Sequence, residues 1–308
     1  MKTENEAQPK VSVLVTTYFR NEYLKKCLES VEAQEYPHIE TIVIDDSGKQ
    51  HAHRVCEEFD VQYIGLEANQ GQNAARNNAF KTADGEYTQF LDDDDQLSPK
   101  KIEKQVRFLE RHNKYEVVYC GRRMESGFEE HPDSDLSGDT LEGILAFDNA
   151  PCVTSTLLID TEVLEDIMPL PEYEASSDLP LKIELARRTK FGIIDELLVL
   201  AGEPSRSMGT NPLNIEYRWQ TLDDYSDLYD SMPSHVKRFA IADTYQKSGR
   251  RRIEGEIWSV GAIADFARAL YYKPERSVRD VAELIISLGG RPTYQLASHA
   301  SNRLRAKN

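Results

Sequence analysis

Short apolar runs alternate with segments of helical periodicity over the first 120 residues of the chain. The runs with the composition of buried strands cover residues 11–15, 41–44, 61–65, 87–91 and 115–120. The segments in which apolar residues recur every three or four positions cover residues 21–34, 50–59 and 73–82 and a stretch that begins at Pro99. Nearly continuous apolar strands separated by amphipathic helices predict an α/β fold, with a mostly parallel sheet that helices cover on both faces.

Polar residues cluster where the expected strands end. Thr17 and Tyr18 follow the first strand, Asp45 and Asp46 follow the second, and four aspartates at 92–95 follow the run at 87–91. In parallel sheets, ligands bind outside the carboxyl ends of the strands. We therefore expect these three clusters to converge in one crevice.

The four consecutive aspartates at 92–95 are the strongest chemical signal in the sequence. Adjacent carboxylates repel one another, and hard oxygen ligands of this kind suit Mg²⁺ or Mn²⁺, which share their coordination shell with substrate phosphates. The alternative is a solvated acidic turn in an acidic protein. Convergence with the other polar clusters favours the metal site.

Several common motifs are absent. The first strand–helix turn lacks GxGxxG, which disfavours a dinucleotide-dependent dehydrogenase, and no GxxxxGK[ST] sequence indicates a P-loop nucleotidase. GxSxG and HExxH are absent as well, so neither a serine hydrolase elbow nor that zinc motif is expected.

Charge is distributed unevenly along the chain. The net charge is −16, but residues 1–232 hold 23 Lys/Arg against 46 Asp/Glu, whereas residues 233–308 hold 14 against 7. The acidic body argues against nucleic acid as a partner, because phosphate backbones require basic surface.

Cysteine usage and the N-terminus bear on the compartment. The four cysteines form no CxxC pair, so we expect reduced core residues in a cytoplasmic protein. Residues 1–9 are expected to form a disordered tail, since the polar start has no apolar segment typical of a signal peptide. No stretch of 18 apolar residues predicts a membrane-spanning helix.

Six segments in order resemble the family 2 glycosyltransferases. They are VSVLVTTY (11–18), QEYPHIETIVIDDSG (34–48), NQG (69–71), AARN (74–77), GEY (85–87) and FLDDDD (90–95). The resemblance covers roughly residues 10–205. It implies the GT-A fold, a Rossmann-like, mostly parallel central sheet flanked by helices, and inverting transfer from a nucleotide-diphospho-sugar, with a UDP-sugar expected.

The resemblance also implies roles in donor binding. Thr17, Asp45 and Asp46, with Tyr18 beside them, would form the pocket for the base and ribose. Arg76 would contact the base or the diphosphate, although a helix-surface ion pair is the alternative.

The same resemblance places the DxD pair of the family within residues 92–95. Asp94 is the first choice for contact with Mg²⁺ or Mn²⁺. Asp92 is the second metal-binding candidate, and Asp92 or Asp93 would contact the ribose or support the metal ligands.

The catalytic base is expected in the second half of the chain. The segment SSDLPLKIELA (176–186) resembles the family segment that opens a helix with Glu-Asp, and Asp178 occupies the position of the base. Ser177 replaces the usual glutamate. The alternative role for Asp178 is a helix N-cap. Nearby carboxylates and burial lead us to expect a raised pKa for Asp178, and Arg206 is a further candidate for phosphate contact.

Four parts are expected along the chain. They are the tail (1–9), a donor-binding half (10–120), an acceptor-binding half (121–212) and a helical, basic C-terminal extension (213–308).

Apolar residues in the extension recur at helical spacing in two groups. The first group is Trp258, Ile263, Phe266, Ala267 and Leu270, and the second is Val278, Val281, Ala282, Ile285 and Leu288. A cap packed on the catalytic domain is one interpretation of these groups. Peripheral contact with anionic lipid at the inner face of the cell membrane is the other.

The leading hypothesis is transfer of one sugar to a hydroxyl of a glycan or of a lipid-linked sugar. Arg218-Trp219 is only a fragment of the QxxRW motif of processive synthases, so we expect single transfers. The alternatives are a sugar-phosphate nucleotidyltransferase and a non-catalytic subunit that binds nucleotide sugars.

Overall fold

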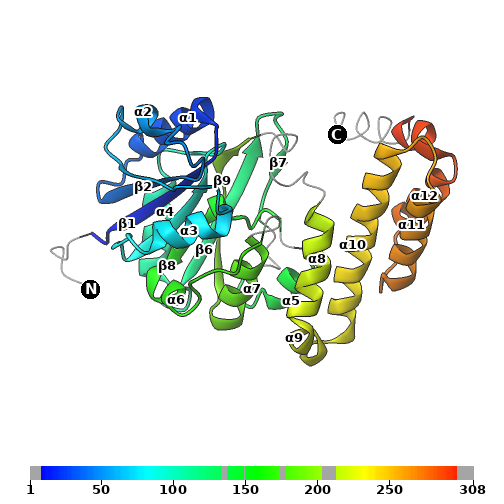
Figure 1. The fold of residues 1–308 in the computed structure, drawn as a ribbon. Helices are drawn as coiled ribbons and strands as arrows, with labels where there is room; N and C mark the ends of the chain where they lie inside the picture. Colours follow the sequence, from blue (N-terminus) through cyan, green and yellow to red (C-terminus); the bar gives the residue numbers. More distant parts are fainter. Residues whose placement is uncertain (1–7, 133–136, 149, 174–177, 203–212, 297–308) are drawn as a thin grey trace. The chain divides into compact units, whose positions relative to one another are not determined.

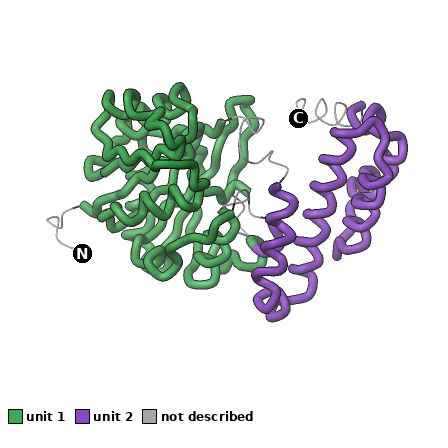
Figure 2. Tube along the Cα trace, viewed as in Figure 1, with its two compact units in different colours: residues 1–144, 149–211 green, residues 145–148, 212–308 purple. Residues whose placement is uncertain are grey.

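A computed structural model describes residues 8–132, 137–148, 150–173, 178–202 and 213–296. The chain divides into two compact units, shown in Figure 2. Residues 1–144 and 149–211 form the first unit, and residues 145–148 and 212–308 form the second.

The first unit is built on one nine-stranded sheet, in which eight strands follow the order β3-β2-β1-β4-β8-β6-β9-β5 and β7 pairs with β6. The strands are β1 (Val11–Thr17), β2 (Ile39–Asp45), β3 (Gln62–Gly65), β4 (Tyr87–Asp92), β5 (Gln96–Leu97), β6 (Val117–Met124), β7 (Glu129–Glu130), β8 (Leu157–Asp160) and β9 (Phe191–Ala201).

Parallel pairing dominates the sheet. β1 lies parallel to both β2 and β4, β2 is parallel to β3, and β6 is parallel to β9. The strand β8 runs antiparallel between β4 and β6, a feature that the sequence pattern did not predict. The predicted α/β class with a mostly parallel central sheet is confirmed, and Figure 1 shows helices on both sides of the sheet.

The helices up to residue 188 are α1 (Asn21–Glu32), α2 (His53–Cys56), α3 (Gln72–Phe80), α4 (Lys101–Arg111), α5 (Leu141–Leu145), α6 (Thr161–Glu165) and α7 (Asp178–Arg188), with a short 3₁₀ turn, η2, at Thr154–Thr156. α1 buries Leu24, Leu28 and Val31, which recur at helical spacing. The helix predicted over 50–59 shortens to the four residues of α2. After α2 the chain continues in tighter turns, in which the Glu58 N–H donates to the Val55 carbonyl and the Phe59 N–H to the Cys56 carbonyl.

The second unit is helical. Its helices are α8 (Leu213–Asp224), α9 (Ser226–Ser231), α10 (Ser234–Gly255), α11 (Val260–Tyr272) and α12 (Val278–Ser287). Ile253, Ala262 and Phe266 form its small apolar core. Among the described residues, no helix combines the length and the apolar character that crossing a bilayer requires.

Neither of the two apolar groups predicted in this unit forms a fully buried helix face. α11 buries Phe266, whereas Trp258 and Ala267 are exposed. In α12 the apolar residues Val278, Val281, Ile285 and Leu288, the last just past its end, are exposed, and the buried residues of the helix are Asp280, Glu283 and Ser287.

Candidate active site

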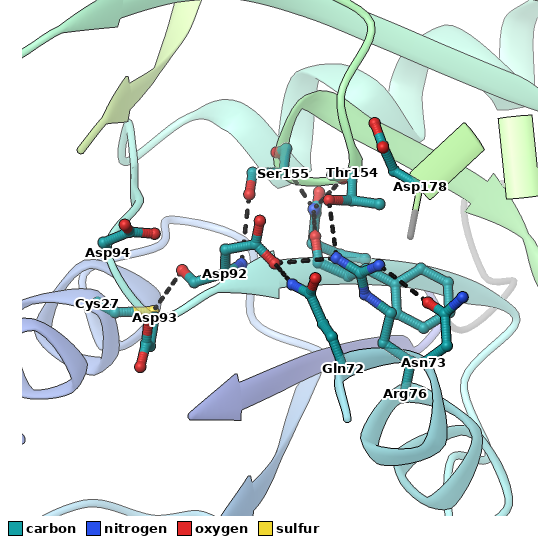
Figure 3. Close-up of polar contacts among 12 residues, drawn as sticks. Cys27, Gln72, Asn73, Arg76, Asp92, Asp93, Asp94, Thr154, Ser155 and Asp178 are labelled. Atoms are coloured by element: carbon teal, nitrogen blue, oxygen red, sulfur yellow. Dashed lines mark hydrogen bonds and ion pairs between the residues drawn. The ribbon is translucent and has the colours of Figure 1, made fainter. Parts of the chain in front are cut away.

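The four aspartates lie where β4 ends and the chain turns into β5. The Asp92 carboxylate accepts hydrogen bonds from Gln72 Nε2 at 2.8 Å and Arg76 Nη2 at 3.0 Å. Its backbone N–H donates to Ser155 Oγ at 3.3 Å. Figure 3 shows the Asp92 side chain turned toward α3, the helix that carries Gln72 and Arg76.

The next two carboxylates contact the first strand–helix turn. Thr17 Oγ1 donates to Asp93 at 2.7 Å, so the end of β1 holds this side chain in place. Arg20 Nη1 lies 3.2 Å from Asp93 and 2.9 Å from Asp94. One guanidinium therefore partly neutralises two carboxylates that would otherwise repel each other.

Burial dominates the electrostatics of this turn. It raises the pKa of Asp93 to about 7, against the lowering effect of the Thr17 hydrogen bond and the Arg20 charge. Burial and the Asp92 charge also raise the pKa of Asp94 and of Asp95. Negative charge is therefore costly here, and a bound cation would stabilise the ionised carboxylates.

The donor set fits a cation shared with a phosphate ligand. No group of three or more His, Cys, Asp or Glu side chains converges on one point in the part of the chain that the structure describes. Mg²⁺ and Mn²⁺ sites that include substrate phosphates need only one or two protein carboxylates. Asp94 and Asp92 would meet that requirement as oxygen donors, and a diphosphate and water would supply the remaining ligands.

The aspartates that end β2 hold the neighbouring loops. Asp45 is buried and accepts hydrogen bonds from the backbone of Ser47 and Ala52 and from the Tyr63 hydroxyl. Burial alone would raise the pKa of Asp45, but these bonds outweigh it and the pKa is lowered. Asp46 accepts from the N–H groups of Gln70 and Gly71, at 2.7 and 2.9 Å.

Both Asp45 and Asp46 thus shape the crevice through backbone contacts. Tyr18, beside them in the predicted pocket, is 49% exposed and packs edge-on against Phe19. Its ring is free to stack against a planar ligand such as a nucleotide base.

Arg76 is the central buried cation of the site, with 2% of its surface exposed. Besides Asp92, its guanidinium contacts Asn73 and Thr154, both at 3.3 Å. The alternative of a helix-surface ion pair is therefore wrong, because the side chain points inward from α3. Its contacts with Asp92 and with η2 join two elements that are more than 60 residues apart in the chain.

Asp178 is the first residue of α7, and its side chain is 27% exposed. Lys182, one turn along the helix and buried, lies 2.8 Å from Asp178 Oδ2. Lys182 also donates to the Cys152 carbonyl at 3.1 Å. The backbone of the chain thus holds the ammonium group in place next to the carboxylate.

The expected raised pKa of Asp178 is wrong. Burial does raise it, but the charge and hydrogen bond of Lys182 and the charge of Arg76 outweigh burial, and the pKa is lowered. The two cations, which the carboxylate pattern alone does not reveal, account for the difference.

Two cations of the site were not singled out as functional from the sequence. Arg20 and Lys182 each pair with a candidate carboxylate. Their positions in the sequence could have indicated this, because Arg20 lies in the first strand–helix turn and Lys182 follows Asp178 by four residues, one helical turn. Arg206, by contrast, lies outside the described residues, as do Ser176 and Ser177.

A family model described as "Glycosyl transferase family 2" matches residues 12–167, which is half of the chain and includes β1, β2, α3 and the aspartate turn. The chain belongs to glycosyl transferase family 2. In this family 2 glycosyltransferase, the polar side chains gather at the carboxyl ends of β1, β2 and β4, where its class of fold binds ligands. The nucleotidyltransferase alternative is therefore set aside.

Similar curated proteins are glycosyltransferases. The putative teichuronic acid biosynthesis glycosyltransferase TuaG of Bacillus subtilis is 28% identical over 199 residues, which are 60% of this chain and 76% of TuaG. An uncharacterized glycosyltransferase of Rickettsia typhi, RT0329, is 33% identical over 120 residues, but that alignment spans only 38% of either protein.

Solved structures share the GT-A fold of this family 2 chain. Residues 1–349 of TarS from S. aureus match it with a TM-score of 0.61 at 18% identity, covering 94% of this chain and 92% of that one. The mannosyltransferase PcManGT from Pyrobaculum calidifontis, in complex with GDP-Man and Mn²⁺, matches with a TM-score of 0.58 at 17% identity, covering 97% and 81%.

Proposed function

We propose that this glycosyltransferase moves one sugar from a nucleotide-diphospho-sugar to an acceptor hydroxyl, with inversion at the anomeric carbon. The observation that carries the proposal is the position of Arg76. Its guanidinium pairs with Asp92 at 3.0 Å, and its charge also acts on Asp178. A candidate donor-binding carboxylate and a candidate base thus interact with the same buried cation.

Donor binding is assigned to the carboxyl ends of the neighbouring strands β1, β2 and β4. Tyr18 offers an exposed ring for the base, and Asp45 and Asp46 hold the surrounding loops. Arg76 acts on the donor through Asp92, whose carboxylate it holds in place from α3. In this proposal Arg206 contributes a phosphate contact.

Asp94, supported by Asp92, is assigned to the divalent cation. Bound there, Mg²⁺ or Mn²⁺ would neutralise the charge that grows on the departing nucleoside diphosphate. Arg20 holds Asp94 and Asp93 in place from the first strand–helix turn. In this assignment Asp93 supports the ligands, because Thr17 and Arg20 already occupy both of its oxygens.

Asp178 is assigned as the general base. It accepts the proton of the acceptor hydroxyl while that oxygen attacks the anomeric carbon on the face opposite the diphosphate. Lys182 and Arg76 keep the carboxylate ionised, so it is ready to accept a proton at neutral pH. With its lowered pKa, the Asp178 carboxylate is a weaker base than one with a raised pKa, but it is fully deprotonated at neutral pH.

The substrate class is inferred from the similar proteins. TuaG is named for teichuronic acid biosynthesis, and TarS has been solved with UDP-GlcNAc. We infer a UDP-sugar donor and an acceptor in a cell-surface glycan, a polysaccharide or a lipid-linked oligosaccharide. PcManGT binds GDP-Man, so GDP-sugars belong among the donors to be tested.

A donor screen tests the proposal. The protein is incubated with Mn²⁺ or Mg²⁺ and a panel of UDP-, GDP- and dTDP-sugars, and release of the nucleoside diphosphate is measured. We expect metal-dependent release from one donor, loss of release in Asp94→Ala, and no change in Asp166→Ala, an exposed aspartate at the end of α6. Binding of a sugar nucleotide without any release would favour the non-catalytic alternative, whereas failure of every sugar nucleotide to bind would contradict both that alternative and the proposal.

A further inference from the structure

The helix α12 presents its apolar side outward. Val278, Val281, Ile285 and Leu288 are 88%, 40%, 61% and 57% exposed, and we call these four residues the α12 face. They are separated by three, four and three residues along the chain, which places them on one side of the helix and its C-terminal cap. An amphipathic helix that only caps a protein core would bury this side.

The opposite side of α12 is polar, buried and hydrogen-bonded. Glu283 pairs with Arg250 of α10 at 2.6 Å, and Asp280 pairs with Lys273 at 2.6 Å. Asp280 also forms a capping box with Ser277. These contacts set the rotation of the helix, because turning the α12 face inward would strip two carboxylates of their partners.

The exposed charges within residues 276–296 are basic, while exposed carboxylates flank this stretch at Glu275 and, beside Trp258, at Glu256. Between residues 276 and 296 the acidic residues are Asp280 and Glu283, both buried and paired. The basic residues of this stretch are Arg276, Arg279 and Arg291, of which the first two are exposed. The sequence beyond it, 297–308, adds three more basic residues and no acidic one.

An aromatic side chain lies at the rim of this surface. The indole Nε1–H of Trp258 donates to the Leu288 carbonyl at 3.1 Å, and the ring remains 57% exposed. Tryptophan combines an apolar ring with a polar N–H group and is enriched at the interface between membrane and water.

We propose that the α12 face, with Trp258 and the flanking arginines, docks the protein on the surface of a membrane that contains anionic lipid. The four apolar side chains would enter the boundary between headgroups and acyl chains, while Arg276 and Arg279 contact lipid phosphates. This would bring the enzyme to a membrane where lipid-linked acceptors reside. Vesicle binding is measured without donor, so its outcome is independent of the proposed glycosyl transfer.

The charge pattern favours lipid over a second copy of the chain. In a two-fold symmetric dimer the same patch contacts itself, so Arg279 of one copy would approach the arginines of the other. Within residues 276–296 no carboxylate is exposed, and the flanking Glu275 offsets only one of the two exposed arginines. An anionic lipid surface complements both the apolar and the basic part of the patch.

Flotation with lipid vesicles tests the proposal. The full chain is mixed with vesicles of phosphatidylcholine alone or of phosphatidylcholine with phosphatidylglycerol. We expect binding to the mixed vesicles that weakens as NaCl rises. Ile285→Glu should lower the partition coefficient more than about tenfold, and Arg279→Gln by about fivefold.

A matched control separates docking from nonspecific adhesion. Phe128 is an exposed apolar residue of the first unit, and Phe128→Glu should leave vesicle binding unchanged. Far-UV circular dichroism and melting temperatures establish that each variant is folded. Absence of wild-type binding to the mixed vesicles, or equal loss in Phe128→Glu, would overturn the proposal. Sedimentation that shows a dimer, dissociated by Ile285→Glu without any vesicle binding, would assign the face to a second copy instead.

Discussion

The ammonium group of Lys182 lies 2.8 Å from Asp178 Oδ2, one turn farther along the helix that Asp178 begins. The pair is intrahelical and anchored, since Lys182 also donates to the Cys152 carbonyl. This charge-assisted contact with Oδ2 restrains the Asp178 carboxylate. We infer that Lys182 is a positioning residue for the candidate base.

Replacing this lysine should change how the rate depends on pH. In Lys182→Met, burial is opposed by the Arg76 charge and a backbone hydrogen bond but no longer by the lysine, so the pKa of Asp178 rises. The base is active when deprotonated, and the acidic limb of the kcat/KM profile should therefore move to higher pH. Lys182→Arg should restore the wild-type limb in part. A uniform loss of rate with an unmoved limb would mean that Lys182 only supports the fold.

Asp178→Asn should abolish transfer and spare donor binding. Loss of a general base lowers the rate by roughly 10²- to 10⁴-fold, whereas the nucleotide contacts assigned to the β1, β2 and β4 edge stay intact. Calorimetric titration with nucleoside diphosphate and a transfer assay measure the two effects. The control is Glu184→Gln on the same helix, whose carboxylate pairs with Arg187 and Arg188. Substantial turnover in the asparagine variant would refute the assignment.

Arg20→Gln should destabilise the apoprotein and make its stability more dependent on metal. The substitution removes the cation beside Asp93 and Asp94, and a loss of about 1 kcal/mol is expected for this partly exposed pair. Added Mn²⁺ would supply positive charge to the same carboxylates, so the rise in melting temperature with Mn²⁺ should exceed that of the wild type. Equal metal responses in both proteins would argue against a cation at this turn.

The buried Lys101 predicts a pH-dependent stability. Its ammonium group donates to Gln89, Gln105 and the Leu157 carbonyl, and burial lowers its pKa to about 8. Between that value and the ordinary 10.5, the unfolded chain binds a proton that the folded chain does not. The penalty for burying the charge is thus fully present below pH 8 and is relieved as pH rises.

The comparison of wild type with Lys101→Met measures this effect. The difference in free energy of unfolding, wild type minus variant, should grow between pH 8 and 10 by up to about 1.4 kcal/mol per pH unit. Urea denaturation at several pH values gives the difference. Lys100→Met, an exposed neighbour on the same stretch of chain, should show no such growth.

The order of the elements and the location of the crevice follow from the sequence alone. Apolar runs at 11–15, 41–44 and 87–91 are buried strands because only a sheet covered on both faces accommodates them. The polar residues that follow them necessarily meet at one edge, since these strands run parallel. Local composition and chain direction suffice for such inferences.

Pairing between side chains was decided by the tertiary structure. Arg76 turns inward to Asp92, and Arg76 with Lys182 reverses the expected direction of the Asp178 pKa. The direction depends on a balance between desolvation and Coulomb attraction that periodicity does not contain. The rotation of α12 is a similar case, because its amphipathic pattern allows either side to face the core. The buried pairs of Asp280 and Glu283 with Lys273 and Arg250 turn its apolar side to the outside.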